Sequence, residues 1–215
     1  MKKLILNVIG LVVAGSAPVL ATPIYDNGAV GSTAAVAING GYSVSDSFTI
    51  SSATSLASAA AGLWVDGGAL PVSLNWSIGT TPFGTDISSG TATLAHTFVD
   101  SVTGLDVYES TFTLSGVLGA GTYYFTLLNA SASDGGGVSW DENHGPSSAT
   151  LKNSANNTFQ IGSESFQLYG ASAPVPDQAS TFLLLGLGCL PLIAFARRER
   201  NSRLACAKQR DNGRI

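Results

Sequence analysis

Apolar and polar side chains alternate with a period of two along much of the chain, and this alternation constrains the fold most strongly. The clearest run is at 72–78, where Val72, Leu74, Trp76 and Ile78 alternate with small polar residues. Successive side chains of a strand point to opposite faces. The pattern therefore predicts a strand with one buried face and one polar face.

Other segments repeat the pattern. The same parity occurs at Tyr42, Val44, Phe48 and Ile50, interrupted by Asp46; at Tyr108, Phe112 and Leu114, opposite Glu109, Thr111 and Thr113; and at Phe166 and Leu168. A glycine-rich turn is expected at 116–121, followed by a more fully buried strand at 122–128. The Ala-rich segment 57–61 fits either a short helix or a strand.

Turn residues separate these runs at intervals of about 8–12 residues, as in sandwiches and barrels. We therefore predict an all-β fold: a single β-sandwich or jelly-roll-like domain at 22–170. Both cysteines, Cys189 and Cys206, follow this segment. The predicted domain must therefore depend on core burial and sheet hydrogen bonds rather than on disulfides.

Charge is distributed unevenly along the chain. The formal charge of −4 combines +2 in residues 1–21, −10 in residues 22–174 and +4 in residues 175–215. The middle segment has eleven acidic residues and one base, Lys152. Such a segment cannot neutralise phosphates, which argues against DNA or RNA as a partner.

The N-terminus has the pattern of a secretory signal peptide. Lys2 and Lys3 precede an apolar run at 4–14, and Val19 and Ala21 occupy the −3 and −1 positions of a small-residue exit. We predict a signal peptide at 1–21, cleaved between Ala21 and Thr22 after export by the Sec machinery. An uncleaved anchor is the alternative, although the apolar run is short for a membrane span.

A second apolar block occupies 181–196 and is followed by Arg197, Arg198, Arg200 and Arg203. Sixteen helical residues reach about 24 Å, against about 30 Å for the hydrocarbon core, and snorkelling arginines can cover the difference. The positive-inside rule would keep the tail at 197–215 cytoplasmic and the body outside. A buried core helix is the alternative.

The junction before this block carries a specific resemblance. Val175, Pro176, Asp177, Ser180 and Thr181 match the Val-Pro-Asp-Ser-Gly-Ser-Thr variant of the PEP-CTERM sorting signal, while Gln178 and Ala179 replace its Ser-Gly pair. Residues 171–180 would then be linker and motif, and 181–196 a transmembrane helix. The resemblance implies recognition by an exosortase-type membrane transpeptidase of a Gram-negative bacterium. Delivery would be to the cell surface or to an exopolysaccharide matrix.

The body also resembles the β-sandwich ectodomains that accompany this signal. The similar segments are Thr81-Pro82-Phe83-Gly84-Thr85, residues 118–124 and residues 137–145. This resemblance implies a fold and no particular activity.

No motif for nucleophilic catalysis or for zinc is found. The chain lacks a Gly-x-Ser-x-Gly elbow, a cysteine paired with histidine, and an HExxH motif. We therefore expect no enzymatic activity and no obligatory cofactor.

One polar segment, 134–145, could carry chemistry. Asp134, Asp141, Glu142 and Asn143 offer the oxygen ligands that calcium prefers, although they lack EF-hand spacing. Acid–base work by Glu142 or His144, as in a secreted hydrolase, is a second possibility. The third is a polar turn with Trp140 docked on the core.

The remaining candidates are aromatic. Trp76 has the parity of the core, whereas Trp64 stands beside a turn and could stack on a sugar if exposed. His96 has strand parity and is expected to be an ordinary sheet histidine. The leading hypothesis is a non-enzymatic exported surface or matrix protein. The alternative is a carbohydrate- or calcium-binding adhesin that uses 134–145 and Trp64.

Overall fold

The structure is a computed structural model that describes residues 22–171 of the chain. The predicted signal peptide at 1–21 lies outside the described residues. So do the predicted sorting motif, membrane helix and basic tail within 172–215.

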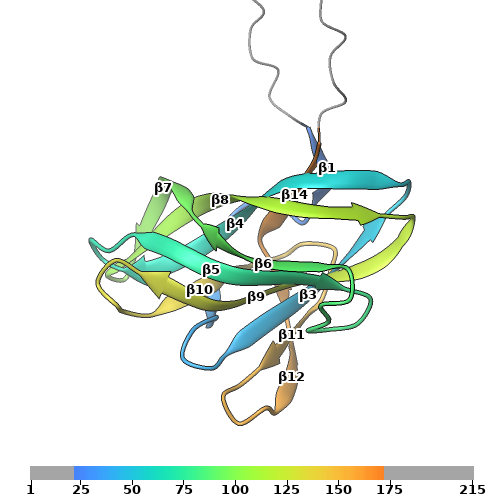
Figure 1. Ribbon diagram of the computed structural model, residues 1–215. Coiled ribbons are helices and arrows are strands. Elements are labelled where there is room, and N and C mark those ends of the chain that lie inside the picture. The colour runs from blue at the N-terminus through green and yellow to red at the C-terminus, as the bar shows by residue number, and fades with distance from the viewer. Residues whose placement is uncertain (1–21, 172–215) are drawn as a thin grey trace, which may run out of the picture. The chain divides into compact units, whose positions relative to one another are not determined.

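Residues 22–171 form two antiparallel sheets (Figure 1). Sheet A comprises β1 (Pro23–Asp26), β2 (Ala34–Ala37), β4 (Thr54–Asp66), β7 (Ala95–Val102), β8 (Leu105–Leu118), β10 (Val138–Asn143), β13 (Ser163–Glu164) and β14 (Phe166–Gly170). Sheet B comprises β3 (Ser43–Ile50), β5 (Pro71–Gly79), β6 (Ser88–Thr93), β9 (Gly121–Ala132), β11 (Ala149–Lys152) and β12 (Thr158–Ile161). The predicted all-β class is confirmed, and the two sheets are consistent with a β-sandwich. The described part of the chain contains no helix, hence none able to span a membrane.

The long strand β4 organises sheet A. Strand β8 pairs along one edge of β4, and β14 and β10 share the other edge. Sheet B has the order β12-β11-β3-β9-β5-β6. Strand β1 pairs with β14, with Pro23 opposite Tyr169, so the two ends of the described chain lie side by side (Figure 1).

The core between the sheets is built around Phe125 of β9. Its ring centroid lies 5.4 Å from that of Phe166, 5.7 Å from that of Trp140 and 6.3 Å from that of Phe112. These separations are in the range that aromatic pairs prefer. The three partners belong to sheet A, so this cluster joins the two sheets, and the predicted burial of Phe112 and Phe166 is confirmed.

The Ala-rich segment 57–61 is part of β4, which settles the choice between helix and strand. Both faces of β4 are covered at 59–65, where every residue is buried, and this leaves little room for large side chains at Gly62. A Cβ atom on Gly62 would come 2.9 Å from Asp141 Cβ and closer still to Ser165 Oγ. A side chain at this position would displace Ser165, Asp141 and Val30, which lie against Gly62.

Three details depart from the sequence prediction. Tyr42, expected to share the core face with Val44, precedes β3 and is 36% exposed. Val72 is 41% exposed, because the pairing of β5 with β9 is irregular between Pro71 and Asn75. The turn expected at 116–121 is shorter, since β8 continues to Leu118. Gly116, at φ 150°, lies opposite Leu56 beside an irregularity of the β4–β8 pairing, so this glycine serves the strand and not the turn.

The position of Phe166 leads to a stability prediction. Phe166→Ala should lower the free energy of unfolding by roughly 3–5 kcal/mol, because it opens a cavity where four other aromatic rings meet. Urea denaturation of the full chain, followed by tryptophan fluorescence, measures the change. The matched control is Phe159→Ala in β12, where the ring is 50% exposed; its effect should stay within about 0.5 kcal/mol. Equal losses would contradict this description of the core.

Candidate functional site

The four residues predicted as calcium ligands are spread over a turn and both faces of a strand. Residues 138–143 form β10 and not the polar turn considered above. Asp134 precedes the strand, and its Oδ1 accepts a hydrogen bond from Gly136 N at 2.9 Å. Asp141 and Glu142 are successive strand residues and point to opposite faces. Within residues 22–171, no three His, Cys, Asp or Glu side chains are grouped to hold a metal. Calcium binding stays a prediction.

Asp141 anchors the segment that covers the outer face of sheet A. Its Oδ2 accepts from Gly31 N at 2.7 Å, and its Oδ1 accepts from Ser32 N at 3.0 Å and from Trp64 Nε1 at 2.8 Å. The carboxylate is fully buried. Three donors from distant parts of the chain satisfy it, so its role in the structure is to hold this segment in place.

Asn143 and His144 lie near the same segment. Asn143 Nδ2 donates to Asn27 O at 2.7 Å, and Asn143 Oδ1 accepts from Gly145 N at 2.9 Å. His144 is exposed and lines a hollow of about 270 Å³ with Gly28 and neighbouring residues. No carboxylate lines this hollow. The geometry therefore gives no support to acid–base chemistry by Glu142 with His144.

The tryptophans are all buried. Trp140 is fully buried and donates from Nε1 to Ser165 O at 2.9 Å, and Trp76 is 5% exposed; both predictions are confirmed. Trp64 is 6% exposed, so the stacking role considered for it is wrong. His96 lies in β7, edge-on to Tyr108 at 5.5 Å, as expected of a sheet histidine.

A buried polar cluster between the sheets was missed from the sequence. Asn27, Asp46 and Glu164 are fully buried. Asp46 Oδ2 accepts from Asn27 Nδ2 at 3.1 Å and from Glu164 N at 2.8 Å. Asp46 Oδ1 and both carboxyl oxygens of Glu164 have no partner among the described residues. The available signal was Asp46 itself, since it shares the parity of the core residues Val44 and Phe48.

Burial sets the protonation of this cluster. It raises the pKa of Glu164 to about 10, and the nearby carboxylates of Glu142, Asp46 and Asp141 act in the same direction. Burial also raises the pKa of Asp46, against the opposing effect of the hydrogen bond from Glu164 N. Glu164 is therefore a neutral acid near pH 7, enclosed in the core.

The raised pKa of Glu164 makes stability depend on pH. Between the unfolded pKa of 4.5 and the folded pKa of about 10, the folded chain holds a proton that the unfolded chain has lost. The contribution of Glu164 to the free energy of unfolding is therefore fully present below pH 4.5. It decreases as pH rises toward the folded pKa, by up to about 1.4 kcal/mol per pH unit. Glu164→Gln should remove this slope, as measured by urea denaturation from pH 5 to pH 9.

Glu109→Gln, the same change at an exposed position, is the control for that experiment and should keep the wild-type slope. If Glu164→Gln also keeps the wild-type slope, Glu164 is not protonated in the fold.

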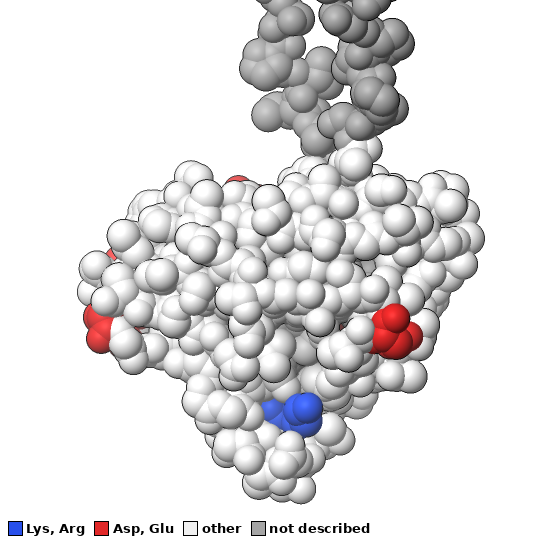
Figure 2. All heavy atoms as spheres, viewed as in Figure 1, with Lys and Arg blue, Asp and Glu red and all other residues white. Residues whose placement is uncertain are grey.

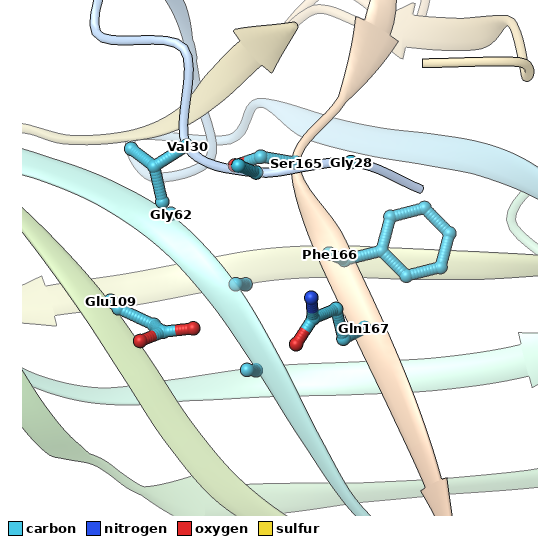
Figure 3. A pocket seen from close by; sticks show the side chains of 10 residues that line it. Gly28, Val30, Gly62, Glu109, Ser165, Phe166 and Gln167 are labelled. Atoms are coloured by element: carbon cyan, nitrogen blue, oxygen red, sulfur yellow. The ribbon is translucent and has the colours of Figure 1, made fainter. Parts of the chain in front are cut away.

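A small pocket opens on the outer side of sheet A. Glu109 of β8 and Gln167 of β14 lie on either side of β4, with Val30 and Gly62 at one end (Figure 3). Its volume of about 20 Å³ leaves room for roughly one water molecule. A substrate would not fit, so we do not assign a function to this pocket.

A larger hollow of about 360 Å³ lies over the outer face of sheet B. Serine, threonine and asparagine side chains line most of it, and Phe83 and Lys152 form part of its wall. Lys152 Nζ lies 4.5 Å from the centre of the Phe83 ring, within cation–π range. Figure 2 shows Lys152 in blue, the one Lys or Arg of residues 22–171, on the projecting β11–β12 hairpin, where it is the last residue of β11 before the turn.

The loop between β5 and β6 holds Phe83 in an unusual conformation. Its φ of 61° is in the left-handed region, which costs a non-glycine residue about 1–3 kcal/mol. Phe83 N donates to Ser45 Oγ at 3.1 Å. Thr80 Oγ1 donates to Asp86 Oδ2 at 2.8 Å and ties the two ends of the loop together. These bonds fix the ring at the edge of the hollow.

Comparison with known proteins identified no similar family or protein. No protein-family model matches the chain, and no curated protein does.

Proposed function

We propose that this chain is a non-enzymatic exported protein of the cell surface or extracellular matrix. In this proposal a single jelly-roll-like β-sandwich is exported behind a signal peptide and held by a short transmembrane helix. An exosortase-type transpeptidase then processes the chain at the PEP-CTERM-like motif. One observation carries the proposal: two apolar segments, each with a basic flank and a small-residue or Pro-Asp junction, bracket an acidic β-rich body.

The architecture of residues 22–171 supports a body that is separate from the two terminal segments. Residues 22–171 contain no cysteine, and their stability comes from two hydrogen-bonded sheets around one aromatic core. Strands β1 and β14 bring the two ends of the body together at one edge. A domain of this kind can be attached through either end while its other surfaces stay accessible.

Three of the eleven acidic residues of the body are buried and are not available as catalytic groups. Asp141 is occupied by three donors, and Asp46 and Glu164 lie in the core away from solvent. Substrate could not reach these carboxyl groups without unfolding. The alternative is a carbohydrate- or calcium-binding adhesin. The buried Trp64 is not available for stacking on a sugar, and the calcium candidates lie on a turn and on both faces of β10.

A sorting variant tests the proposal in the producing bacterium. Pro176→Ala combined with Asp177→Asn should abolish C-terminal processing, because these residues form the recognisable part of the motif. The protein should then keep its C-terminal segment and accumulate in the membrane fraction, as measured by intact mass and fractionation.

Gln178→Ser combined with Ala179→Gly is the matched control. It restores the Ser-Gly pair of the motif, so processing should stay at least as complete as in the wild type. Unchanged processing of the Pro176/Asp177 variant would refute the sorting proposal.

A further inference from the structure

The floor of the hollow over sheet B is formed by two rows of directly paired residues. One row crosses the sheet as Lys152, Ser43, Leu128, Asn75 and Thr91, on β11, β3, β9, β5 and β6. Directly paired residues present their side chains on the same face. This row therefore places the Lys152 ammonium beside the Ser43 hydroxyl and the Asn75 amide beside the Thr91 hydroxyl, with neighbours about one strand spacing apart and the apolar Leu128 between the two pairs.

The second row lies two residues away and is also polar. It crosses the same strands as Thr150, Ser45, Thr126, Ser77 and Ser89. Ser45 Oγ accepts from Thr126 Oγ1 at 2.9 Å and from Phe83 N, and so attaches the Phe83 loop to this row. All five residues of the first row line the hollow, together with Thr126, Ser77 and Ser89 of the second. The floor is therefore mostly polar, with Leu128 in it and the Phe83 ring at its edge.

One polar atom in the floor lacks a partner. Ser43 is 4% exposed, lines the hollow, and its Oγ has no hydrogen-bond partner among the described residues. A buried hydroxyl is nearly always hydrogen-bonded in a native protein, to protein, water or ligand. Ser43 stands beside Lys152 in the first row, so a ligand held by the ammonium could also satisfy this hydroxyl.

The charge of the hollow contrasts with that of the body. Residues 22–174 carry a net charge of −10, yet none of the residues that line the hollow is acidic and one is Lys152. An ammonium group in a recess without carboxylates attracts an anion, and the surrounding acidic surface repels anions elsewhere.

We propose that this hollow binds an acidic saccharide, a sugar ring bearing one carboxylate within a polysaccharide. One ammonium matches one carboxylate, and the rows of hydroxyl and amide groups match the hydroxyls of a sugar. The volume of about 360 Å³ is at the small end of ligand sites, which range over about 300–1,000 Å³. The Phe83 ring offers apolar area to the C–H face of the sugar. Inorganic phosphate shares the negative charge but would leave most of the floor without partners.

Calorimetric titration of the purified full chain tests this site. The ligands are an oligogalacturonate, a neutral malto-oligosaccharide of the same length, and inorganic phosphate. The oligogalacturonate should bind at least about tenfold more tightly than either of the others, since only it supplies both the carboxylate and the hydroxyls. Binding should weaken as salt screens the Lys152 charge.

Variants assign the binding to this hollow. Lys152→Gln should weaken oligogalacturonate binding at least about tenfold, while Lys152→Arg keeps the charge and most of the affinity. Phe83→Asn removes the ring but tolerates the left-handed backbone, and it should also weaken binding. Phe159→Ala, which removes an exposed ring outside the hollow, should change nothing.

Three results would overturn the proposal: no binding of oligogalacturonate, equal binding of the neutral oligosaccharide or of phosphate, or full binding by Lys152→Gln. None of them bears on sorting, because the sorting test changes only residues 176–179.

Discussion

A single carboxylate oxygen, Asp46 Oδ2, links the two sheets by hydrogen bonds, beside the contact of the Phe48 ring with the Phe166 ring. It belongs to β3 of sheet B and accepts hydrogen bonds from Glu164 N of β13 in sheet A and from Asn27 Nδ2, just after β1. Burying a charged carboxyl group costs more free energy than burying a neutral one, and hydrogen bonds reduce the cost of either. The cluster meets this cost with donors to Asp46 and with a proton on Glu164, whose pKa is raised to about 10.

The same cluster positions the outer face of sheet B. Asn27 Nδ2 also lies 2.6 Å from Ser147 Oγ and 2.9 Å from Ser163 Oγ, and its two N–H groups are shared among these acceptors. Ser147 precedes β11 by two residues, and β11 ends at Lys152. The strand that carries Lys152, the one cation of the described residues, therefore begins two residues after a contact with this network. Removing that network should disturb the hollow as well as lower stability.

Local patterns predicted the strands well and the polar interior poorly. Alternation alone located the buried faces of β5 and β14, because it depends only on neighbouring residues. Asp46 looked like an interruption of its strand, since its partner Glu164 is 118 residues away. Segment 134–145 looked like a polar turn for the same reason. The donors that let Asp141 lie in a buried strand, Gly31 and Ser32, are about as distant in sequence. The hollow could not be predicted from the sequence either, because its floor forms only when five strands pair in register.

An acidic, cysteine-free β body between two apolar segments suits a protein that is delivered and then works by binding. The intact mass of the mature protein, measured together with its cellular fraction, tests this account most directly. The account predicts a chain that begins at Thr22 and ends near Asp177, recovered from the cell surface or the matrix. The full chain of 21.9 kDa, retained inside the cell with both ends intact, would contradict it.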